Sequence, residues 1–384
     1  MVKAKLLRNT ERGRTCNIES WGAEKEPKSP LNLQTPAYLT YTRFGHIPHL
    51  TWDVAQKELS HLEQKPIYQV SMAAIFECLL AIDEAGGIIK FASMPENCLT
   101  HLTIHDPLGR IASGFNKTKG IAVWSARAGR KDVCSEAYPV SIAAVKSDTI
   151  TALSDYDLPF DAQKKRQGKS LTRTKAWNEA LFSEESKTGG RPAFAPICGG
   201  SNKDTRFAFA KAFVQVPWAS GFSIELWHFS LGPKVDKKQV YEKDVIAELL
   251  GETMLLLPQD KVRLVEGAFN PTQILHLIKL GVDLFDSSFA SLMADEGKAF
   301  KIADDFESTW EFSVLDFNDA KFNDDTSKLY DHCSCYPCQT FTKAYLRHLV
   351  NCKEMLAMVL LTIHNMTEFD RMFARIRESL QLAQ

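Results

Sequence analysis

The strongest constraint on the fold is a group of three closely spaced cysteines near the C-terminus, followed by one distant histidine. These residues are Cys333, Cys335, Cys338 and His364, and twenty-five residues separate the last cysteine from the histidine. Three thiolates and one imidazole form a tetrahedral zinc set, and four protein ligands leave no position for a reacting water. We therefore predict one structural Zn²⁺ ion per chain, which clasps two distant segments together.

The same cysteines are compatible with a disulfide, with inert buried thiols or with an iron–sulfur cluster. Cysteines at one-residue spacing bridge poorly because disulfide geometry is restrictive. Nine cysteines, an odd number, also fit a reducing compartment better than a disulfide framework. His348 and Cys352 are rival metal ligands, but their helical spacing among apolar neighbours favours packing in the core.

Charge and hydropathy bound what the chain can bind as a whole. The formal net charge is -1 and the isoelectric point is about 6.8, so nucleic acid or an anionic membrane would have to be bound by a local patch. No apolar run approaches the roughly twenty residues of a spanning helix, and the N-terminal run is too short for a signal peptide. We expect a soluble, cytoplasmic protein.

The most basic stretch is Lys164–Lys175, where six of twelve residues are Lys or Arg. Such a run is commonly a solvated loop leading into a helix. It can also supply local contacts to phosphates, even in a chain without net positive charge. Both interpretations stay open on the sequence alone.

Helical and strand-like patterns alternate along much of the chain, which is typical of a parallel sheet with helices packed outside it. A break at Gly45–His49 contains His46 and His49, which we expect to be loop residues and not a metal pair. Strands are predicted at Thr35–Thr42, Ile121–Trp124 and Phe213–Val216. Helices are predicted at Thr51–Leu59 with Thr51 as N-cap, Val70–Glu84 before Gly86, Ser141–Val145, and Val240–Leu250 before Gly251, whereas Ser183–Asp204 is predicted to be a loop.

The clearest unit is a strand, a helix and a second strand between Lys261 and Phe289. Val262–Val265 is strand-like, Asn270 and Pro271 favour a helix start, and Val282–Phe285 is the next strand. A unit this short predicts parallel strands joined by a right-handed crossover.

Glu266 and Asp286 follow these two strands directly, so both carboxylates should lie at the carboxyl edge of the sheet. Barrel and open-sheet enzymes keep their chemistry at that edge. Repeated units of this kind suit a (β/α)8 barrel. A doubly wound sheet is the alternative, although no Gly-x-Gly-x-x-Gly follows a strand and no Walker-type phosphate loop is present.

Three helices are predicted after the cysteines. The first has an apolar face that includes Phe341, Tyr345 and Leu349, the second covers Met355–His364, and the third covers Phe369–Leu380. The metal would join the turn before the first of these helices to the end of the second, so metal binding should stabilise this unit.

These segments resemble tRNA-guanine transglycosylases. The resemblance is carried by Phe317–Thr326, Cys333–Cys338, Thr342–Leu349, Leu360–Asn365, the nucleophile-like Gly281–Asp286 and the first-strand-like Thr35–Leu39. It implies one transglycosylase-like domain: an irregular (β/α)8 TIM barrel, about residues 1–315, with an inserted zinc-binding subdomain at 316–366 and a C-terminal helix at 367–384.

The resemblance also implies chemistry on the first anticodon base of certain tRNAs. Eukaryotic members exchange guanine for queuine at the wobble position of tRNAs with GUN anticodons, those for aspartate, asparagine, histidine and tyrosine. One aspartate attacks the ribose while a second handles protons. Asp286 stands at the nucleophile position.

Several pocket motifs depart from the catalytic pattern. Ala290–Leu292 replaces a proline-threonine-arginine run, Ser220–Glu225 replaces a glycine-rich turn, and Leu153–Tyr156 replaces an acidic segment. The motif that supplies the second aspartate is absent. The pattern resembles the non-catalytic members of the family, which form a heterodimer with a catalytic queuine tRNA-ribosyltransferase subunit.

By this resemblance we expect no catalytic residue here, and we expect Asp286 to be inactive. We expect the catalytic subunit and tRNA as partners, a homodimer in isolation, and peripheral association with the mitochondrial outer membrane. The alternative is an active transglycosylase with Asp286 as nucleophile.

Overall fold

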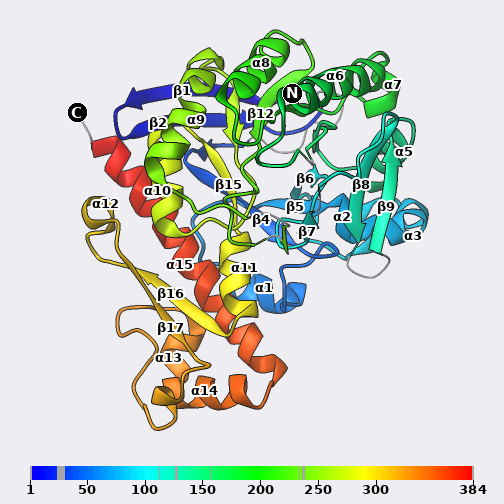
Figure 1. The fold of residues 1–384 in the computed structure, drawn as a ribbon. Helices are drawn as coiled ribbons and strands as arrows, with labels where there is room; N and C mark the ends of the chain where they lie inside the picture. The colour runs from blue at the N-terminus through cyan, green and yellow to red at the C-terminus, as the bar shows by residue number, and fades with distance from the viewer. Residues whose placement is uncertain are drawn as a thin grey trace.

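Eight parallel strands close into a barrel, which confirms the predicted fold class (Figure 1). The computed structural model describes residues 2–23, 31–111, 113–125, 129–156, 158–232, 234–235 and 238–382. The barrel strands are β4 (Ala37–Thr42), β5 (Ile67–Ser71), β6 (Leu99–Thr103), β10 (Thr149–Thr151), β11 (Ala193–Ile197), β12 (Ala219–Ile224), β14 (Val262–Leu264) and β15 (Leu284–Asp286). The pairing of β15 with β4 closes the ring, with Phe285 opposite Tyr38.

Helices surround the barrel and bury their apolar faces against it. They are α1 (Trp52–Glu58), α2 (Met72–Ile75), the 3-10 turn η1 (Phe76–Cys78), α3 (Leu79–Ala85), α4 (Ile88–Phe91), α5 (Ala137–Val145), α6 (Lys164–Leu181), α7 (Glu185–Thr188), α8 (Lys203–Phe213), α9 (Lys243–Leu256), α10 (Pro271–Lys279) and α11 (Ser288–Asp295).

Helix starts follow from local side-chain chemistry. The Thr51 hydroxyl accepts a hydrogen bond from the Val54 N–H and caps α1, as predicted. At the start of α10, Asn270 and Gln273 form a reciprocal capping box before Pro271. These caps fix where each crossover helix leaves its strand.

Short sheets stand outside the barrel. They are β1 (Lys3–Thr10), β2 (Gly13–Ser20) and β3 (Leu33–Gln34); β7 (Arg110–Ile111) with β13 (Lys234–Val235); β8 (Gly120–Ser125) with β9 (Gly129–Cys134); and β16 (Lys298–Ile302) with β17 (Phe312–Asp316), which flank α12 (Phe306–Thr309). The predicted Ile121–Trp124 strand is therefore real but belongs to a hairpin. Buried Arg14 on β2 pairs with Asp283 at 2.9 Å and anchors the first sheet beside β15.

The C-terminal region packs against β16 and β17 and extends away from the barrel (Figure 1). It contains η2 (Ala320–Phe322), α13 (Tyr336–Thr340), α14 (Lys343–Asn351) and α15 (Met355–Leu382). The two helices predicted over Met355–Leu380 are one continuous helix, so that prediction is wrong. The division into residues 1–315, 316–366 and 367–384 stays a prediction, although α15 crosses its last boundary.

Four other local predictions are wrong. The predicted loop Ser183–Asp204 contains α7 and barrel strand β11, and Phe213–Val216 lies at the end of α8 instead of in a strand. Gly251 lies within α9 and does not end it, and the helix predicted from Val70 begins at Met72 after β5. Buried parallel strands are short apolar runs, which periodicity does not distinguish from loops or helix ends.

Candidate functional site

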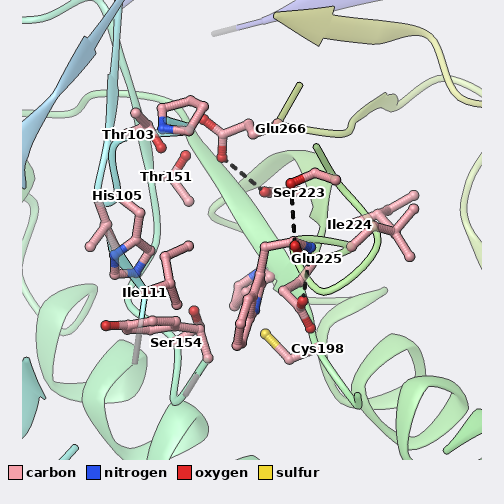
Figure 2. Close-up of a pocket in the computed structure, with 18 residues that line it drawn as sticks. Thr103, His105, Ile111, Thr151, Ser154, Cys198, Ser223, Ile224, Glu225 and Glu266 are labelled. Atoms are coloured by element: carbon pink, nitrogen blue, oxygen red, sulfur yellow. Dashed lines mark hydrogen bonds between the residues drawn. The ribbon is translucent and has the colours of Figure 1, made fainter. Parts of the chain in front are cut away.

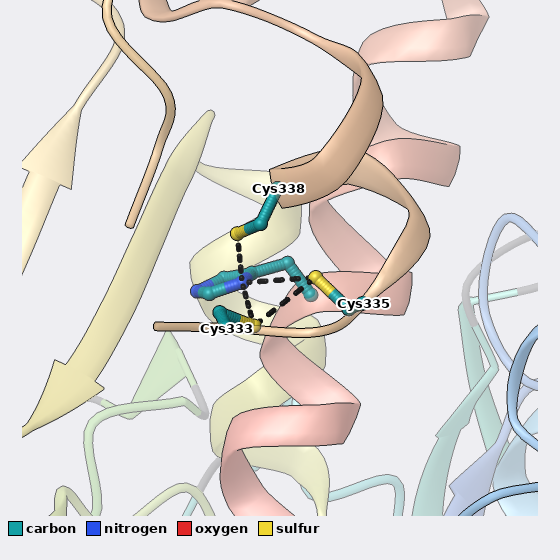
Figure 3. A group of neighbouring side chains, drawn as sticks. Cys333, Cys335 and Cys338 are labelled. Atoms are coloured by element: carbon teal, nitrogen blue, oxygen red, sulfur yellow. Dashed lines mark hydrogen bonds between the residues drawn. The ribbon is translucent and has the colours of Figure 1, made fainter. Parts of the chain in front are cut away.

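The predicted metal ligands converge in the structure (Figure 3). Cys333 lies in the turn before α13, Cys335 caps that helix, Cys338 lies within it, and His364 comes from α15. Their ligand atoms all lie within 4.8 Å of one another. The Nδ1 atom of His364 is 3.7, 3.5 and 3.3 Å from the three sulfur atoms in sequence order. Tetrahedral bond lengths of about 2.1 and 2.3 Å place such atoms about 3.6 Å apart, so the residues fit one metal ion.

The surroundings of His364 set its tautomer. Its Nε2 lies 3.0 Å from the carbonyl oxygen of Phe300 on β16, which can only accept a hydrogen bond. Nε2 therefore carries the hydrogen, and the Nδ1 lone pair faces the cysteines. Hydrogen bonds among the three thiols lower the pKa of Cys333 and raise that of Cys338, so without a metal the proton is shared unequally within the cluster.

The rival ligands lie elsewhere. His348 and Cys352 contact each other on the exposed side of α14, away from the cluster, so the core packing predicted for them is wrong. His49 contacts Asp295, with 2.6 Å between Nε2 and Oδ1, and His46 packs beside Trp52. Among the described residues, the cysteine–histidine cluster is the one group arranged to hold a metal.

The two predicted carboxylates meet at the barrel mouth. Asp286 ends β15 and is 1% exposed. Its Oδ2 accepts a hydrogen bond from the Gly267 N–H at 2.7 Å, and its Oδ1 accepts one from the Ser288 N–H at 2.9 Å. Burial raises its pKa. Asp286 thus holds together the two loops that follow β14 and β15.

Glu266 is the neighbouring acid, and sequence reasoning gave it no partners. It accepts hydrogen bonds from the Gln69 amide at 2.8 Å and from the Ser223 hydroxyl at 3.4 Å. Burial, with a smaller contribution from the Asp286 charge, raises the pKa of Glu266 to about 7. A proton can therefore reside on Glu266 near neutral pH.

A cavity of about 80 Å³ lies beside these acids (Figure 2). Glu266 and Ser223 line it, but Asp286 does not. The rings of His105 and Tyr156 pack 3.6 Å apart at its wall, and burial lowers the pKa of His105 to about 3. Typical ligand pockets measure roughly 300–1,000 Å³. The barrel mouth is largely filled by its own side chains.

The segment Leu153–Tyr156 has a structural role here. Asp155 is fully buried, and its carboxylate oxygens bind Arg166 at 2.8 Å and Arg173 at 3.2 Å. These arginines belong to the basic stretch, which forms the start of α6 and not a loop. Most of Ser220–Glu225 lies in strand β12, which ends at Ile224. Glu225 follows the strand and pairs with buried Arg206 at 3.8 Å.

Comparison with known proteins agrees with this architecture. A family model described as queuine tRNA-ribosyltransferase matches residues 11–383. A Caenorhabditis elegans protein named queuine tRNA-ribosyltransferase accessory subunit 2 is 40% identical over 385 residues, covering 99% of each chain. Proteins of the same name from Ixodes scapularis and Aedes aegypti are each 31% identical, over 90% and 92% of this chain and 89% and 84% of their own. The chain therefore belongs to the queuine tRNA-ribosyltransferase family.

Proposed function

We propose that this chain is the non-catalytic subunit of a heterodimeric queuine tRNA-ribosyltransferase. It pairs with a catalytic subunit of the same fold and helps to hold tRNA while guanine is exchanged for queuine at the wobble position of tRNAs with GUN anticodons. The names of its relatives, and the match over nearly their full length, support this assignment.

The state of Asp286 is the observation that carries the proposal. A carboxylate nucleophile needs a lone pair directed into an open cavity beside the substrate. Both oxygens of Asp286 are occupied by backbone N–H groups, and the residue does not line the cavity at the barrel mouth. These hydrogen bonds and the position of Asp286 outside the cavity lining support a structural role for its carboxylate.

The test compares the chain alone with the assembled pair. We expect no base exchange by the purified chain, and exchange after mixing with the catalytic subunit at equal stoichiometry. The alternative is an active transglycosylase. The proximity of Asp286 and Glu266 favours it, because one of two adjacent acids can act as a nucleophile while the other transfers protons. A covalent tRNA adduct that forms on the chain alone and disappears in Asp286→Asn would establish that alternative.

The metal region offers a surface for the partner. The rings of Tyr336, Phe341 and Tyr345 contact one another in a row along α13 and α14, with Tyr336 44% and Tyr345 39% exposed. Met355 at the start of α15 is 86% exposed. Exposed aromatic rows are typical of protein interfaces. We propose that the catalytic subunit covers this row, which a second copy of the chain would occupy in isolation.

We further propose that the metal is zinc and that the protein acts in the cytoplasm, with peripheral attachment to the mitochondrial outer membrane. The donor set of three cysteines and one histidine supports zinc.

The nine cysteines form no disulfides, which fits a reducing compartment. No helix among the described residues is long and apolar enough to cross a membrane. Elemental analysis that finds iron would refute the zinc assignment.

A further inference from the structure

Helix α6 lies on the outside of the barrel (Figure 1). One face of this helix concentrates lysine side chains. At about 100° per residue, Lys164 and Lys175 fall along one edge of this face, and Lys165 and Lys169 fall along the other. Gly168 and Thr172 lie between the two edges, and all six residues are exposed. We call this set the α6 lysine face.

The arginines and the lysines of this helix have separate roles. Arg166 and Arg173 turn inward to buried Asp155. In the part of the chain that the structure describes, no ion pair or hydrogen bond involves the side chains of the four lysines. The inward arginines therefore secure the helix, whereas the outward lysines have no internal function.

The start of α6 is unfavourable for cations. The first turn contains Lys164 and Lys165 but no acidic residue, and Gln163 provides no side-chain cap. The helix dipole places partial positive charge at this end, so cations here destabilise the helix and an anion stabilises it. The third cation of this turn, Arg166, is offset by hydrogen bonds to the Asp155 carboxylate. The two lysines thus lower the stability of their own helix.

Gly168 adds an independent observation. It lies inside an 18-residue helix, where glycine is a poor helix former. Its φ is not in the left-handed region, and a Cβ atom would meet nothing within 4 Å. Neither backbone nor packing requires glycine here. The missing side chain instead lets another molecule approach the helix closely between the two lysine edges.

We propose that the α6 lysine face binds the phosphate backbone of tRNA. The lysine side chains along the two edges are flexible, and the small residues between them leave room for a phosphate backbone to lie against the helix. Contacts of this kind position the RNA without reading its bases. A membrane-binding face would carry exposed apolar residues beside its cations. The centre of this face holds Gly168 and Thr172 and, one turn beyond Lys175, the exposed carboxylate of Glu179. This inference rests on the proposed function, because tRNA is the nucleic acid which that function supplies.

The experiment measures tRNA binding by the assembled heterodimer over a range of salt concentrations. In the quadruple variant Lys164→Gln, Lys165→Gln, Lys169→Gln and Lys175→Gln, we expect at least about tenfold weaker binding near 0.1 M salt. The slope of log K against log[salt] should fall by about 0.7–0.9 for each lost phosphate contact. The Tm should stay equal or rise, because cations leave the helix N-terminus. The matched control neutralises four exposed lysines on other elements: Lys3, Lys5, Lys57 and Lys90.

The variant Gly168→Ala tests the proposal in a second way, because it should change the Tm and the affinity for tRNA in opposite directions. The added methyl should raise the Tm of the heterodimer and weaken tRNA binding, a combination that a purely structural glycine would not produce. Wild-type affinity and salt slope in the quadruple variant would overturn the proposal.

Heterodimer formation and guanine exchange, measured on the same samples, distinguish a failure of the proposed function from a failure of the α6 lysine face. Absence of the heterodimer refutes the proposed function, whereas an active heterodimer whose tRNA binding ignores these lysines refutes the α6 lysine face alone. Loss of binding to phosphatidylcholine–phosphatidylserine vesicles with tRNA binding retained would identify a membrane surface and also overturn the proposal.

Discussion

Asp286, which the family resemblance places at the nucleophile position, forms hydrogen bonds that suit a structural residue. Each oxygen accepts one backbone N–H, from Gly267 and from Ser288. Asparagine at this position offers one oxygen and an amide that cannot accept, so Asp286→Asn should leave one buried N–H unpaired. We expect a loss of about 1–3 kcal/mol in the free energy of unfolding, measured with urea.

The same variant separates structure from chemistry. Below its unfolding transition, the heterodimer with Asp286→Asn should exchange guanine at the wild-type rate. A large loss of exchange with unchanged heterodimer stability would instead show that Asp286 takes part in the reaction.

Glu266 should make stability depend on pH. Its pKa is about 7 when folded and near 4.5 when exposed, so the folded state holds the proton more tightly. As pH rises from about 4.5 to 7, the unfolded state releases this proton first and stability falls, by on the order of 3 kcal/mol. Asp283, with a pKa raised to about 6 by burial, contributes a slope of the same sign.

The contribution of Glu266 is the difference between the pH dependence of the unfolding free energy in the wild type and in a variant that cannot ionise at this position. Glu266→Gln keeps an oxygen for Gln69 and Ser223 but cannot ionise, so its unfolding free energy should fall less over this pH range. Parallel curves for the two proteins would show that Glu266 does not carry a raised pKa.

At the scale of elements, α15 connects the metal cluster to the barrel. His364 faces the cysteines, and the next residue, Asn365, bonds β16 through the Phe300 N–H at 3.1 Å and the Lys298 carbonyl at 2.9 Å. The Glu368 carboxylate accepts from the Ile302 N–H at 2.8 Å. One helical segment therefore supplies a residue that could bind a metal and completes the edge of a strand.

Removing the metal should loosen this region selectively. In Cys335→Ser, or after chelation, we expect faster amide exchange in α13, α14 and the first half of α15, while the barrel strands keep their protection, because metal binding contributes folding free energy. Elemental analysis should fall from about one zinc per chain towards none. Cys352→Ser is the matched control, since Cys352 is exposed and outside the cluster. Equal exchange in both variants would contradict a structural metal.

Elements with local signals could be predicted from the sequence. A helix cap depends on residues only three positions apart, as at Thr51 and Asn270, and the three cysteines lie within six residues. Sequence alone therefore identifies these features. β11 and β12 could not be identified, because a strand buried on both sides carries no alternating pattern. The partners of Glu266 come from distant strands, so only the closed barrel brings them together.

The helix α14 shows why a buried face can be misassigned. The sequence favours a core face that includes Phe341, Tyr345 and Leu349. The structure confirms Leu349 but buries Leu346 and Val350 beside it, and leaves Tyr345 exposed. Both faces are apolar, and periodicity cannot distinguish a face that meets the core from one that meets a partner. Apolar surface in excess of what the core uses is itself a sign of an interface.

At the scale of the whole molecule, the proposed heterodimer would use that second face as its interface. Because Phe341 and Tyr345 stack at 5.3 Å with an interplanar angle of 16°, they present one preorganised surface to a partner. Truncating central aromatics at an interface commonly costs 2 kcal/mol or more. Phe341→Ala with Tyr345→Ala should therefore weaken heterodimer formation at least about thirtyfold, measured by analytical ultracentrifugation.

If the catalytic site lies in the partner, as proposed, base exchange should fall in parallel with heterodimer formation and recover at high subunit concentration. The matched control is Val240→Ala with Leu255→Ala, two residues at 78% and 84% exposure on other elements. If both double variants assemble equally well, the aromatic row is not the interface. If the aromatic variant assembles but loses exchange, this subunit contributes to the reaction itself and not only to assembly.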